Sequence, residues 1–482
     1  MKFVRSCTIA SAALLMLAAL SGAQTWTPLH NQPSFAANTA LLLTDGTVMA
    51  QDTNASDWWR LTPDNTGSYI NGTWKQVASL PPNYAPLYHS AAVLVDGRLI
   101  IEGGEYNGTN TPVWTNQGAI YDPKTNKWTM IHPPSGWTSI GDAESVILPN
   151  GTYMQSNALS IQQATFNPKT LAWTQINNTN KADGFDEEGW LLLPNGNVLT
   201  VDSGNAPNSE IYNATTKKWA SAGSTIVRLS DPSTGELGPM VLRPDGTVFA
   251  TGCASSGVAH TAIYDTKTGK WKAGPSFPKV GGKFVGIGDG PGALLPSGNV
   301  LLMASPGVFG NGVVFFEWNG AKLLPAPNVP GASTEPSYVG DMLILPTGQI
   351  LLTQQSTDVE VYTAKGSPNP VWAPTIKTAP TSVTRGNSYV ISGTQFNGLS
   401  QGAMYGDDTQ AATNYPLVRI TNNATKHVFY AKTHNHSSMG VATGGTVVST
   451  TLDVPSAMET GASSMVVVAN GIASLPVNVT VN

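Results

Sequence analysis

Cysteine and charge are both scarce in this sequence, and each shortage excludes a class of protein. Two cysteines occur in 482 residues, and Cys7 falls in the N-terminal segment that we predict to be cleaved. Cys253 then has no partner within the chain, which excludes a disulfide-stapled scaffold. Charged residues make up 11% of the chain, the formal net charge is −5, and no cluster of Lys or Arg occurs. Nucleic acid is therefore not an expected partner, because binding it requires a basic surface.

Long apolar runs are also lacking, since no stretch reaches the roughly 20 apolar residues that a membrane-spanning helix needs. A shorter apolar stretch at 10–20 follows two basic residues and precedes the small residues at 21–23. This order is typical of a secretory signal peptide, so we predict that residues 1–23 are removed by cleavage near Ala23. The mature chain is predicted to be secreted or periplasmic, to have no membrane span, and to be a monomer.

Glycine and proline are abundant instead, with 49 and 34 residues. An apolar strand, a tight turn and a second apolar strand follow one another repeatedly, as in LLLTDGTVMA at 41–50. Asp-Gly and Asn-Gly between apolar runs predict hairpins, because type I′ turns require a positive φ. The phrase recurs about every 50 residues, with its turn glycines at Gly46, Gly97, Gly151, Gly196, Gly246, Gly298 and Gly348.

Further strands follow these hairpins and complete a repeating unit. A third strand resembles GAIYD at 118–122, and a fourth usually carries a tryptophan such as Trp128. Four strands per roughly 50 residues is the period of a kelch-type β-propeller. The sequence therefore predicts an all-β fold with a seven-bladed propeller over residues 24–372. Trp26 has no blade of its own, so we predict that its strand completes the blade of Gly348 and leaves no exposed edge.

The repeat ends near residue 373. Later segments such as SVTRGNSYVISGTQF and GTVVSTTLDVP alternate apolar and polar residues, as half-buried strands do. The length that remains is close to the roughly 100 residues of an immunoglobulin-like domain. Residues 373–482 are therefore predicted to form an immunoglobulin-like, early-set β-sandwich.

The opposite face of the propeller is predicted to carry the chemistry. Residues eight or nine positions before each turn glycine lie up to about 26–30 Å from it, around the mouth of the central channel. Carboxylates crowded there must protonate, spread into solvent or share a cation. A solvated acidic lip, a cation site and a hydrogen-bonding floor for a polyhydroxyl ligand all remain open. These upstream positions hold Tyr88, His89, Asp142, Glu144, Asp186, Glu187, Glu188, Glu236, Asp289, Tyr338 and Asp341.

The chain resembles the galactose oxidase and glyoxal oxidase group. YHSAAVLVDGRLIIEGG at 88–104 resembles a blade of that family, and APTIKTAPTSVTRGNSYVISG at 373–393 resembles the entry to its last domain. In that group a hairpin of the last domain carries a histidine to copper at the channel mouth. The resemblance therefore implies that His434, in YAKTHNHSSMG, projects among the rim residues, with His436 more peripheral.

The sequence departs from that family at the metal ligands. The family's cofactor requires two tyrosines, two histidines and a cysteine bonded to one tyrosine. Tyr338 matches one tyrosine, but Val339 replaces the adjacent histidine. Tyr88 and His89 stand where the cysteine is expected, and Asp142 stands near the position of the second tyrosine. The resemblance therefore implies the fold without the assembled radical-copper cofactor.

We predict a secreted galactose-oxidase-like propeller that binds a metal ion, a carbohydrate-like ligand, or both, at the channel mouth. Copper, zinc, manganese and calcium are not distinguished, and no catalytic residue is assigned. Metal-binding candidates are His434, His89, Tyr338 and Asp142. Ligand-binding candidates are Tyr88, Glu187, Glu236, Asp289 and His436.

Several alternatives remain open at this point. The protein is either non-catalytic or an enzyme, for example a metal-dependent oxidoreductase acting on alcohol or aldehyde groups, or a metal-assisted lyase or hydrolase. A purely adhesive extracellular module is a third reading, because propellers often serve as binding platforms. His89 could be a structural histidine, and His436 could cap a hairpin turn.

Overall fold

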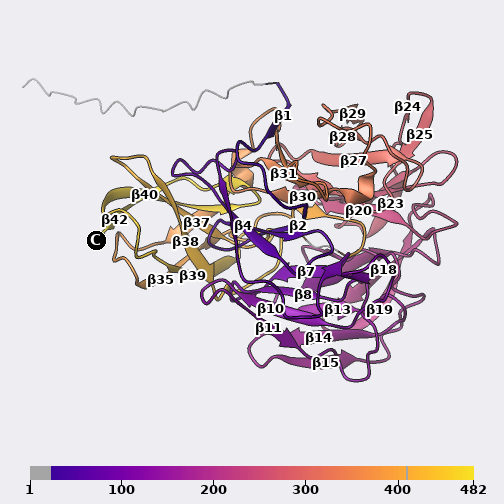
Figure 1. Cartoon of the computed structure of the whole chain (residues 1–482), viewed down its shortest axis with the longest axis horizontal. Helices are drawn as coiled ribbons and strands as arrows, with labels where there is room; N and C mark the ends of the chain where they lie inside the picture. The colour runs from indigo at the N-terminus through magenta and orange to yellow at the C-terminus, as the bar shows by residue number, and fades with distance from the viewer. Residues whose placement is uncertain (1–22, 409–410) are drawn as a thin grey trace, which may run out of the picture.

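The computed structural model describes residues 23–408 and 411–482, and this part of the chain is built almost entirely of β-strands (Figure 1). Within those residues the helical elements are two 3-10 turns, η1 (Ser337–Val339) and η2 (Pro370–Trp372). No helix in this part of the chain is long and apolar enough to cross a membrane. The predicted signal peptide lies outside the described residues, apart from Ala23.

Six antiparallel sheets of four strands have the arrangement of propeller blades. Their strands, from the innermost strand of each sheet outwards, are β2 (Ala37–Leu42), β3 (Val48–Asp52), β4 (Trp58–Thr62) and β5 (Thr73–Gln76); β7 (Ser90–Val93), β8 (Leu99–Glu102), β10 (Gly118–Asp122) and β11 (Lys127–Ile131); β12 (Ser145–Ile147), β13 (Tyr153–Ser156), β14 (Gln163–Asn167) and β15 (Ala172–Ile176); β16 (Leu191–Leu192), β17 (Val198–Val201), β18 (Asn208–Asn213) and β19 (Lys218–Ser224); β20 (Leu237–Leu242), β21 (Thr247–Gly252), β22 (Thr261–Asp265) and β23 (Lys270–Ala273); β30 (Asp341–Ile344), β31 (Ile350–Thr353), β32 (Glu360–Thr363) and β1 (Thr25–Pro28).

A seven-stranded sheet lies between two of these blades. It contains four consecutive strands, β26 (Gly292–Leu294), β27 (Val300–Pro306), β28 (Val314–Trp318) and β29 (Leu323–Pro325), together with β24 (Lys279–Val280), β25 (Lys283–Gly286) and β36 (Ala403–Met404). A separate pair is formed by β6 (Pro86–Leu87) and β9 (Tyr106–Asn107). The innermost strands contact one another in the order β2, β7, β12, β16, β20, β26 and β30, and then β2 again.

The two ends of the propeller segment pair with each other, as the orphan tryptophan strand predicted. Strand β1 runs antiparallel to β32, with Trp26 opposite Tyr362. The Trp26 ring lies 4.9 Å from the rings of Phe315 and Tyr362, and its indole N–H donates to the carbonyl oxygen of Pro327. This pairing covers the outer edge of β32, which would otherwise present unpaired backbone groups.

The tryptophans of the outer strands join neighbouring sheets, which is the structural role expected of them. Trp128 packs 5.1 Å from Tyr121 within its own sheet and donates to the carbonyl oxygen of Ala78. Trp173 packs against Phe166 in the same way and donates to the carbonyl oxygen of His132. Each indole therefore buries its ring and satisfies its N–H group, as large amphipathic side chains do when buried.

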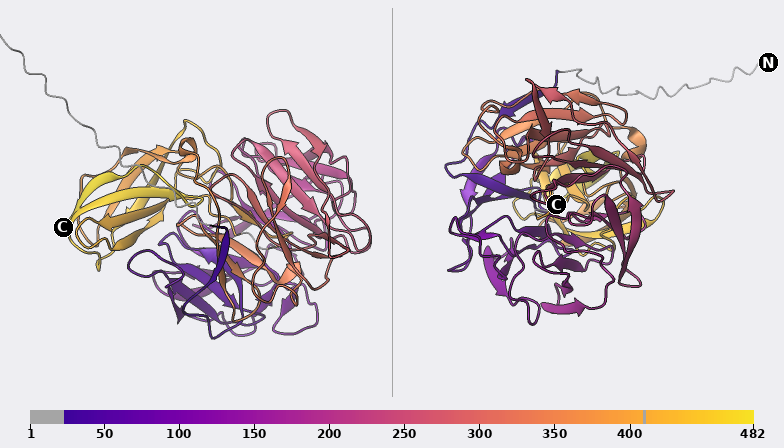
Figure 2. Two further views of the ribbon diagram at one scale, coloured as in Figure 1. Left: turned by 90° about the horizontal axis from the view of Figure 1, so that it is seen from above. Right: turned by 90° about the vertical axis from the view of Figure 1, so that its right-hand side faces the viewer.

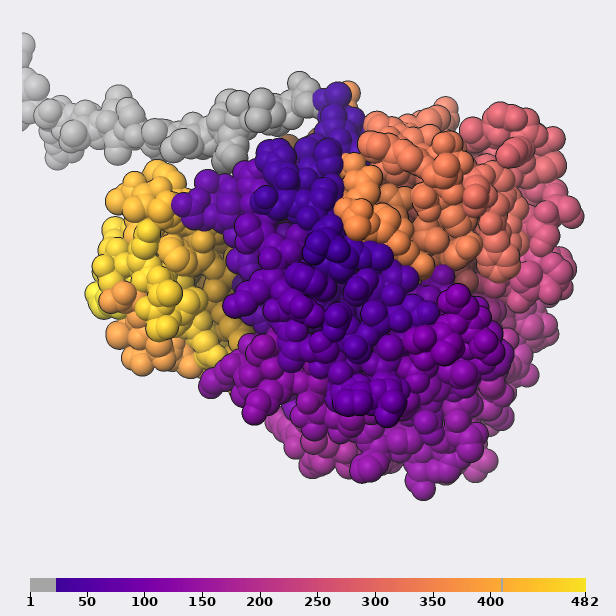
Figure 3. All heavy atoms as spheres, viewed as in Figure 1, coloured from indigo at the N-terminus to yellow at the C-terminus, as the bar shows by residue number. Residues whose placement is uncertain are grey.

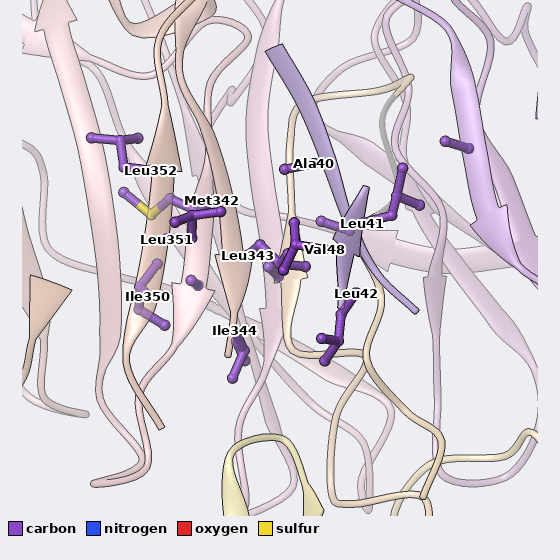
Figure 4. Close-up of a cluster of buried hydrophobic side chains, with 14 of the residues drawn as sticks. Ala40, Leu41, Leu42, Val48, Met342, Leu343, Ile344, Ile350, Leu351 and Leu352 are labelled. Atoms are coloured by element: carbon purple, nitrogen blue, oxygen red, sulfur yellow. The ribbon is translucent and has the colours of Figure 1, made fainter. Parts of the chain in front are cut away.

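The core fills the spaces between facing sheets. Figure 4 shows one such layer, in which apolar side chains of the β2–β3 hairpin face those of the β30–β31 hairpin. All the labelled residues are buried, so alternate positions do not reach solvent as they would in a one-sided sheet. Continuous apolar runs such as ANTALL and ILLT are the sequence counterpart of this burial on both faces.

The C-terminal part forms a curled nine-stranded sheet at one face of the propeller (Figure 2). It has a buried apolar core of its own, separate from the propeller cores. Its strands are β33 (Thr375–Thr378), β34 (Ser382–Val383), β35 (Ser388–Thr394), β37 (Leu417–Asn422), β38 (Val428–His434), β39 (Val447–Asp453), β40 (Gly461–Ala469), β41 (Ile472–Ala473) and β42 (Val477–Val481).

This C-terminal sheet packs on the hairpin-turn face of the propeller, where Figure 3 shows yellow and indigo surfaces in contact. The Tyr430 ring lies against the first turn, where a Cβ on Gly46 would be 2.4 Å from it. Gly46 also has a φ of +78°, so two separate constraints require glycine there. Thr433 N–H donates to the carbonyl oxygen of Thr44 in the same turn.

Candidate functional site

A long segment between β35 and β37, residues 396–415, leaves the C-terminal sheet and enters the propeller. Its strand β36 pairs with the innermost strand β26 and contacts β20 and β30. The side-chain oxygen of Gln401 accepts a 2.7 Å hydrogen bond from the backbone N–H of Leu192 in β16. Contacts with four innermost strands place this segment along the centre of the ring.

Close packing fixes the path of this central segment. A Cβ on Gly189 would lie 2.3 Å from the carbonyl oxygen of Gly406, so a side chain at that position would collide with the segment. The Tyr405 hydroxyl donates a 2.5 Å hydrogen bond to the carbonyl oxygen of Tyr338 in η1. Tyr405 and Asp407 are thereby brought to the channel mouth on the side opposite the hairpin turns.

A cavity of about 610 Å³ opens at this mouth. The propeller contributes most of its wall and the central segment contributes two residues. Among its described lining residues there is no histidine, cysteine, lysine or arginine. The lining consists of Leu87, Tyr88, Glu105, Tyr106, Asn110, Asp142, Glu187, Glu236, Asp289, Phe309, Tyr338, Val339, Gln355, Tyr405 and Asp407.

Three of these carboxylates form a compact cluster, which we call the mouth triad: Glu187, Glu236 and Asp289. One oxygen from each lies within 4.8 Å of the others. Each residue stands shortly before an innermost strand, β16, β20 or β26, so three adjacent sheets converge at this point. Glu187 and Asp289 have positive φ values of 60° and 39°, which direct the backbone of both lead-in segments into sharp turns.

Burial and mutual repulsion favour the protonated forms of these groups. Burial, followed by the charge of Glu187, raises the pKa of Glu236 from 4.5 to about 10. The pKa values of Glu187 and Asp289 are raised well above their ordinary values by burial and by each other's charge or that of Glu236. Burial also raises the pKa of Asp407 to about 7. The group therefore resists full ionisation unless a cation is present.

Aromatic side chains complete the wall. Phe309 is 49% exposed, and its ring meets the ring of Tyr338 edge-on at 5.7 Å. The Tyr88 hydroxyl accepts a 3.2 Å hydrogen bond from the amide of Gln355. Burial, followed by the charge of Glu105, raises the pKa of Tyr106 to about 12. At neutral pH the tyrosines thus present neutral hydroxyl groups beside the carboxyl groups.

Six of the predicted site residues line this cavity: Tyr88, Asp142, Glu187, Glu236, Asp289 and Tyr338. His89 does not, because its side chain turns away from the channel into the propeller and is fully buried. Its ring nitrogens lie 2.8 Å from the Gln51 side chain and 3.1 Å from the Ser90 carbonyl oxygen. Burial lowers the pKa of His89 to about 4, so it is neutral and satisfied, which fits the structural alternative.

The structure places His434 on the opposite side of the propeller from the mouth, and the expected position is corrected accordingly. His434 ends β38, where the N–H of the next residue, Asn435, donates to Val95 beside the second hairpin turn. Its Nε2 lies 3.1 Å from an Asp453 carboxylate oxygen. Strand β38 pairs on both edges within the C-terminal sheet, so it cannot extend as a free hairpin into the channel.

His436 lies on the same side as His434. It is 6% exposed, its ring stacks on Tyr415 at 6.3 Å, and its Nδ1 lies 2.9 Å from the Thr450 hydroxyl. Burial lowers its pKa to about 3. These contacts are those of a neutral residue within the interface between the C-terminal sheet and the propeller.

Tyr405, Asp407, Glu105, Tyr106 and Phe309 line the site without having been singled out from the sequence. A signal for the first two was present. The stretch between β35 and β37 is more than 20 residues long and contains QFNGLSQGAMYGDD, whereas ordered connections are usually far shorter. Glu105 and Phe309 lie in loops that follow inner strands and carry no repeating pattern, so the sequence contained no comparable signal for them.

Comparison with known proteins supports the fold. No protein-family model matches the chain. The kelch-like protein terF of Aspergillus terreus is 32% identical over 87 residues, which span 18% of this chain and 18% of terF. A copper-bound fungal alcohol oxidase of the AA5 family aligns over 96% of this chain and 100% of its own, with a TM-score of 0.53 and 14% identity. The chain has a galactose-oxidase-like kelch propeller fold. At this identity the resemblance concerns the fold alone.

The donor atoms at the mouth differ from those that copper prefers. Its described lining offers carboxylate, phenol and amide oxygens, whereas copper sites are built mainly from imidazole nitrogen and sulfur. Val339 presents an apolar side chain to the cavity. Cys253 is buried, and its thiol donates to the carbonyl oxygen of Glu236. These residues do not fit a radical-copper cofactor.

Proposed function

We propose that the protein is a secreted, seven-bladed galactose-oxidase-like propeller followed by an immunoglobulin-like domain. The cyclic order of innermost strands supports the blade count if β26 to β29 are taken as one blade of the ring. The curled nine-stranded sheet with its own core supports the second domain. The domain limits are then residues 24–372 and 373–482, after cleavage near Ala23.

The channel mouth binds a metal ion, a polyhydroxyl ligand of carbohydrate type, or both, without the radical-copper cofactor. The observation that carries this function is the cavity of about 610 Å³ lined by carboxyl and phenol groups. Carboxylates and hydroxyls are suited to hydroxyl-rich ligands, because they both accept and donate hydrogen bonds. The exposed ring of Phe309 adds an apolar surface for the C–H face of a sugar ring.

Binding to a glycan and polyol panel tests this function, with calorimetry on each hit. We expect Phe309→Ala to weaken binding at least about tenfold, a loss of roughly 1.4 kcal/mol. The control is Ile226→Ala, which removes an equally exposed apolar side chain elsewhere on the propeller and should leave binding unchanged. Binding to no member of the panel, or equal effects of both variants, would contradict a polyhydroxyl site at the mouth.

Copper loading tests the other half of the proposal. We expect no hydrogen peroxide from galactose, glyoxal or simple alcohols, because neither a ligand histidine nor a thiol reaches the cavity. The control is Tyr338→Phe, which removes the phenol that the family resemblance assigns to copper. Peroxide production above that variant would show that the cofactor assembles after all.

An acid–base enzyme is a second candidate. Asp407, with a pKa raised to about 7, faces Asp142 and the mouth triad across the same cavity. A carboxyl group that is half protonated at neutral pH beside other carboxyl groups is suited to general acid–base catalysis. This reading is tested by turnover of the panel hits in EDTA. Loss of turnover in Asp407→Asn, with binding retained, would support it.

A further inference from the structure

The mouth triad contains buried oxygen atoms that receive no hydrogen bond. Glu236 is 7% exposed and lines the cavity, and its Oε2 has no hydrogen-bond partner among the described residues. Asp289 Oδ1 lacks one as well. A buried carboxylate oxygen normally accepts at least one hydrogen bond, since the cost of leaving it bare is several kcal/mol. These two oxygens therefore point to a ligand that the protein itself does not provide.

The charges around the triad indicate the kind of ligand. The groups that most strongly affect Glu187, Glu236 and Asp289 are other carboxyl groups, from neighbouring blades and from Asp407 of the central segment. No basic residue is among the described residues of the cavity wall. An anionic ligand would be repelled, whereas a cation would relieve the repulsion within the triad.

We propose that Glu187, Glu236 and Asp289 bind one hard divalent cation, of which Ca²⁺ is the best fit. All three ligands are carboxylate oxygens, which Ca²⁺, Mg²⁺ and Mn²⁺ prefer to imidazole or thiolate. Oxygens within 4.8 Å of one another can share an ion with metal–oxygen distances of about 2.3–2.6 Å, the range of Ca²⁺. Mg²⁺ requires distances of about 2.0–2.1 Å and therefore a tighter arrangement of the same groups.

This assignment rests on the proposed function for its second half: positions left open on the cation face the cavity and would take water or the hydroxyls of a bound polyhydroxyl ligand. The set is distinct from the residues first assigned to metal, since it includes no histidine and no tyrosine. His434 and His89 have no part in it, because both lie outside the cavity.

Terbium luminescence tests the site directly. Tb³⁺ takes the same oxygen ligands as Ca²⁺, and tyrosines such as Tyr405 and Tyr88 line the same cavity and can excite it. We expect one Tb³⁺ per chain, displaced by Ca²⁺, with calorimetry on Ca²⁺ giving the same stoichiometry. Glu236→Gln and Asp289→Asn should each weaken binding at least tenfold.

Glu105→Gln is the matched control. It removes one negative charge from the same cavity wall, but Glu105 is not among the groups that most affect the triad. We expect its affinity to change less than threefold. Melting curves of all variants without metal establish that each is folded, and glutamine resembles the protonated form of Glu236 closely.

Four results would overturn the proposal. They are no stoichiometric binding of Ca²⁺ or Tb³⁺ at pH 8, binding that survives both triad substitutions, equal weakening by Glu105→Gln, and binding of Cu²⁺ with no binding of hard cations. Glycan binding measured in EDTA separates this proposal from the function above. Glycans that bind equally well with and without Ca²⁺, in a protein that binds no cation, refute the cation site alone. Cation binding with no glycan hit refutes the polyhydroxyl ligand alone.

Discussion

Two clusters of buried carboxylates lie close together in the sequence and are neutralised in different ways. Lys181 places its ammonium group 3.0 Å from Glu188 and 2.7 Å from Glu210, and it also pairs with Asp183. The mouth triad contains Glu187, the residue directly before Glu188, yet no basic side chain lines its cavity. The left-handed backbone at Glu187, with a φ of 60°, lets consecutive glutamates belong to different clusters.

The difference concerns where the neutralising charge comes from. Burial alone would lower the pKa of Lys181, but the charges of Glu188 and Asp183 raise it above its ordinary value, so the lysine remains charged. The first cluster is therefore a permanent internal ion-pair network, with the rings of Phe185 and Trp219 packed near the ammonium group. The mouth triad lacks such a lysine and must take protons or an external cation. A fold that can place a lysine beside buried carboxylates does so in the wall and leaves the channel mouth open.

The largest effect should come from removing the internal cation. Lys181→Met leaves Asp183, Glu188 and Glu210 without their shared partner, and we expect the free energy of unfolding to fall by about 3–5 kcal/mol. Chemical denaturation at pH 7 measures this. Lys217→Met removes an exposed lysine of the same region and should change stability by less than about 0.5 kcal/mol. Equal effects of the two substitutions would mean that the ion-pair network is not structural.

The next prediction applies one substitution to both clusters with opposite results. Without metal at pH 8, Glu236→Gln should raise the free energy of unfolding by about 1–3 kcal/mol, because an amide needs no proton or cation. Glu188→Gln should lower it by a similar amount, because it weakens a buried charged hydrogen bond to Lys181. Denaturation of both variants in EDTA gives the comparison. Changes of the same sign would contradict the distinction between the clusters.

The pH dependence sharpens the comparison further. The carboxyl groups facing Glu236 are those of Glu187, Asp289, Asp142 and Asp407, and in the folded protein their pKa values are all raised. The stability that such groups contribute is fully present below their unfolded pKa values near 4.5 and is lost as pH rises. We expect the melting temperature in EDTA to fall between pH 5 and pH 9, as Asp407 ionises near 7 and Glu236 near 10.

Calcium should oppose that loss, because it binds the ionised carboxylates. At tenfold excess over its Kd, Ca²⁺ should add about 1.4 kcal/mol at pH 8 and much less at pH 5, where protons compete for the same oxygens. Scanning calorimetry with Ca²⁺ and with EDTA at both pH values measures the difference. In Glu236→Gln the calcium effect should disappear. A calcium effect that is independent of pH would place the ion somewhere other than the triad.

Much of the architecture was accessible from the sequence because each repeat reports its own structure. The Asp-Gly and Asn-Gly turns and the apolar runs around them correspond to the paired inner strands, and Trp26 does pair with the strand before residue 364. The acidic character of the mouth was also accessible, because Glu236 and Asp289 stand at a fixed distance before a turn glycine. Local patterns sufficed wherever the repeat fixes which face a residue reaches.

The contribution of the C-terminal part was not accessible in the same way. Residues 396–415 and 430–440 both look like loops or strand ends, and no local pattern says which of them enters the ring. The family resemblance favoured His434, but β38 pairs on both of its edges, which leaves the other segment to fill the channel. The choice depends on strand pairing over long sequence separations, which a single sequence does not display.

The smallest effect should come from His434. It lies against the hairpin-turn face and pairs with Asp453, and the two side chains are 22% and 41% exposed. A partly exposed pair of this kind contributes less than about 1 kcal/mol, so His434→Ala should lower stability only slightly. Because the cavity lies at the other face, the variant should bind Ca²⁺ and Tb³⁺ with an affinity within twofold of the unmodified protein. Asp453→Asn should have a similarly small effect on stability, since it breaks the same contact from the other side. Loss of cation binding in His434→Ala would mean that this histidine reaches the mouth, and the central segment would then have to follow a different path through the propeller.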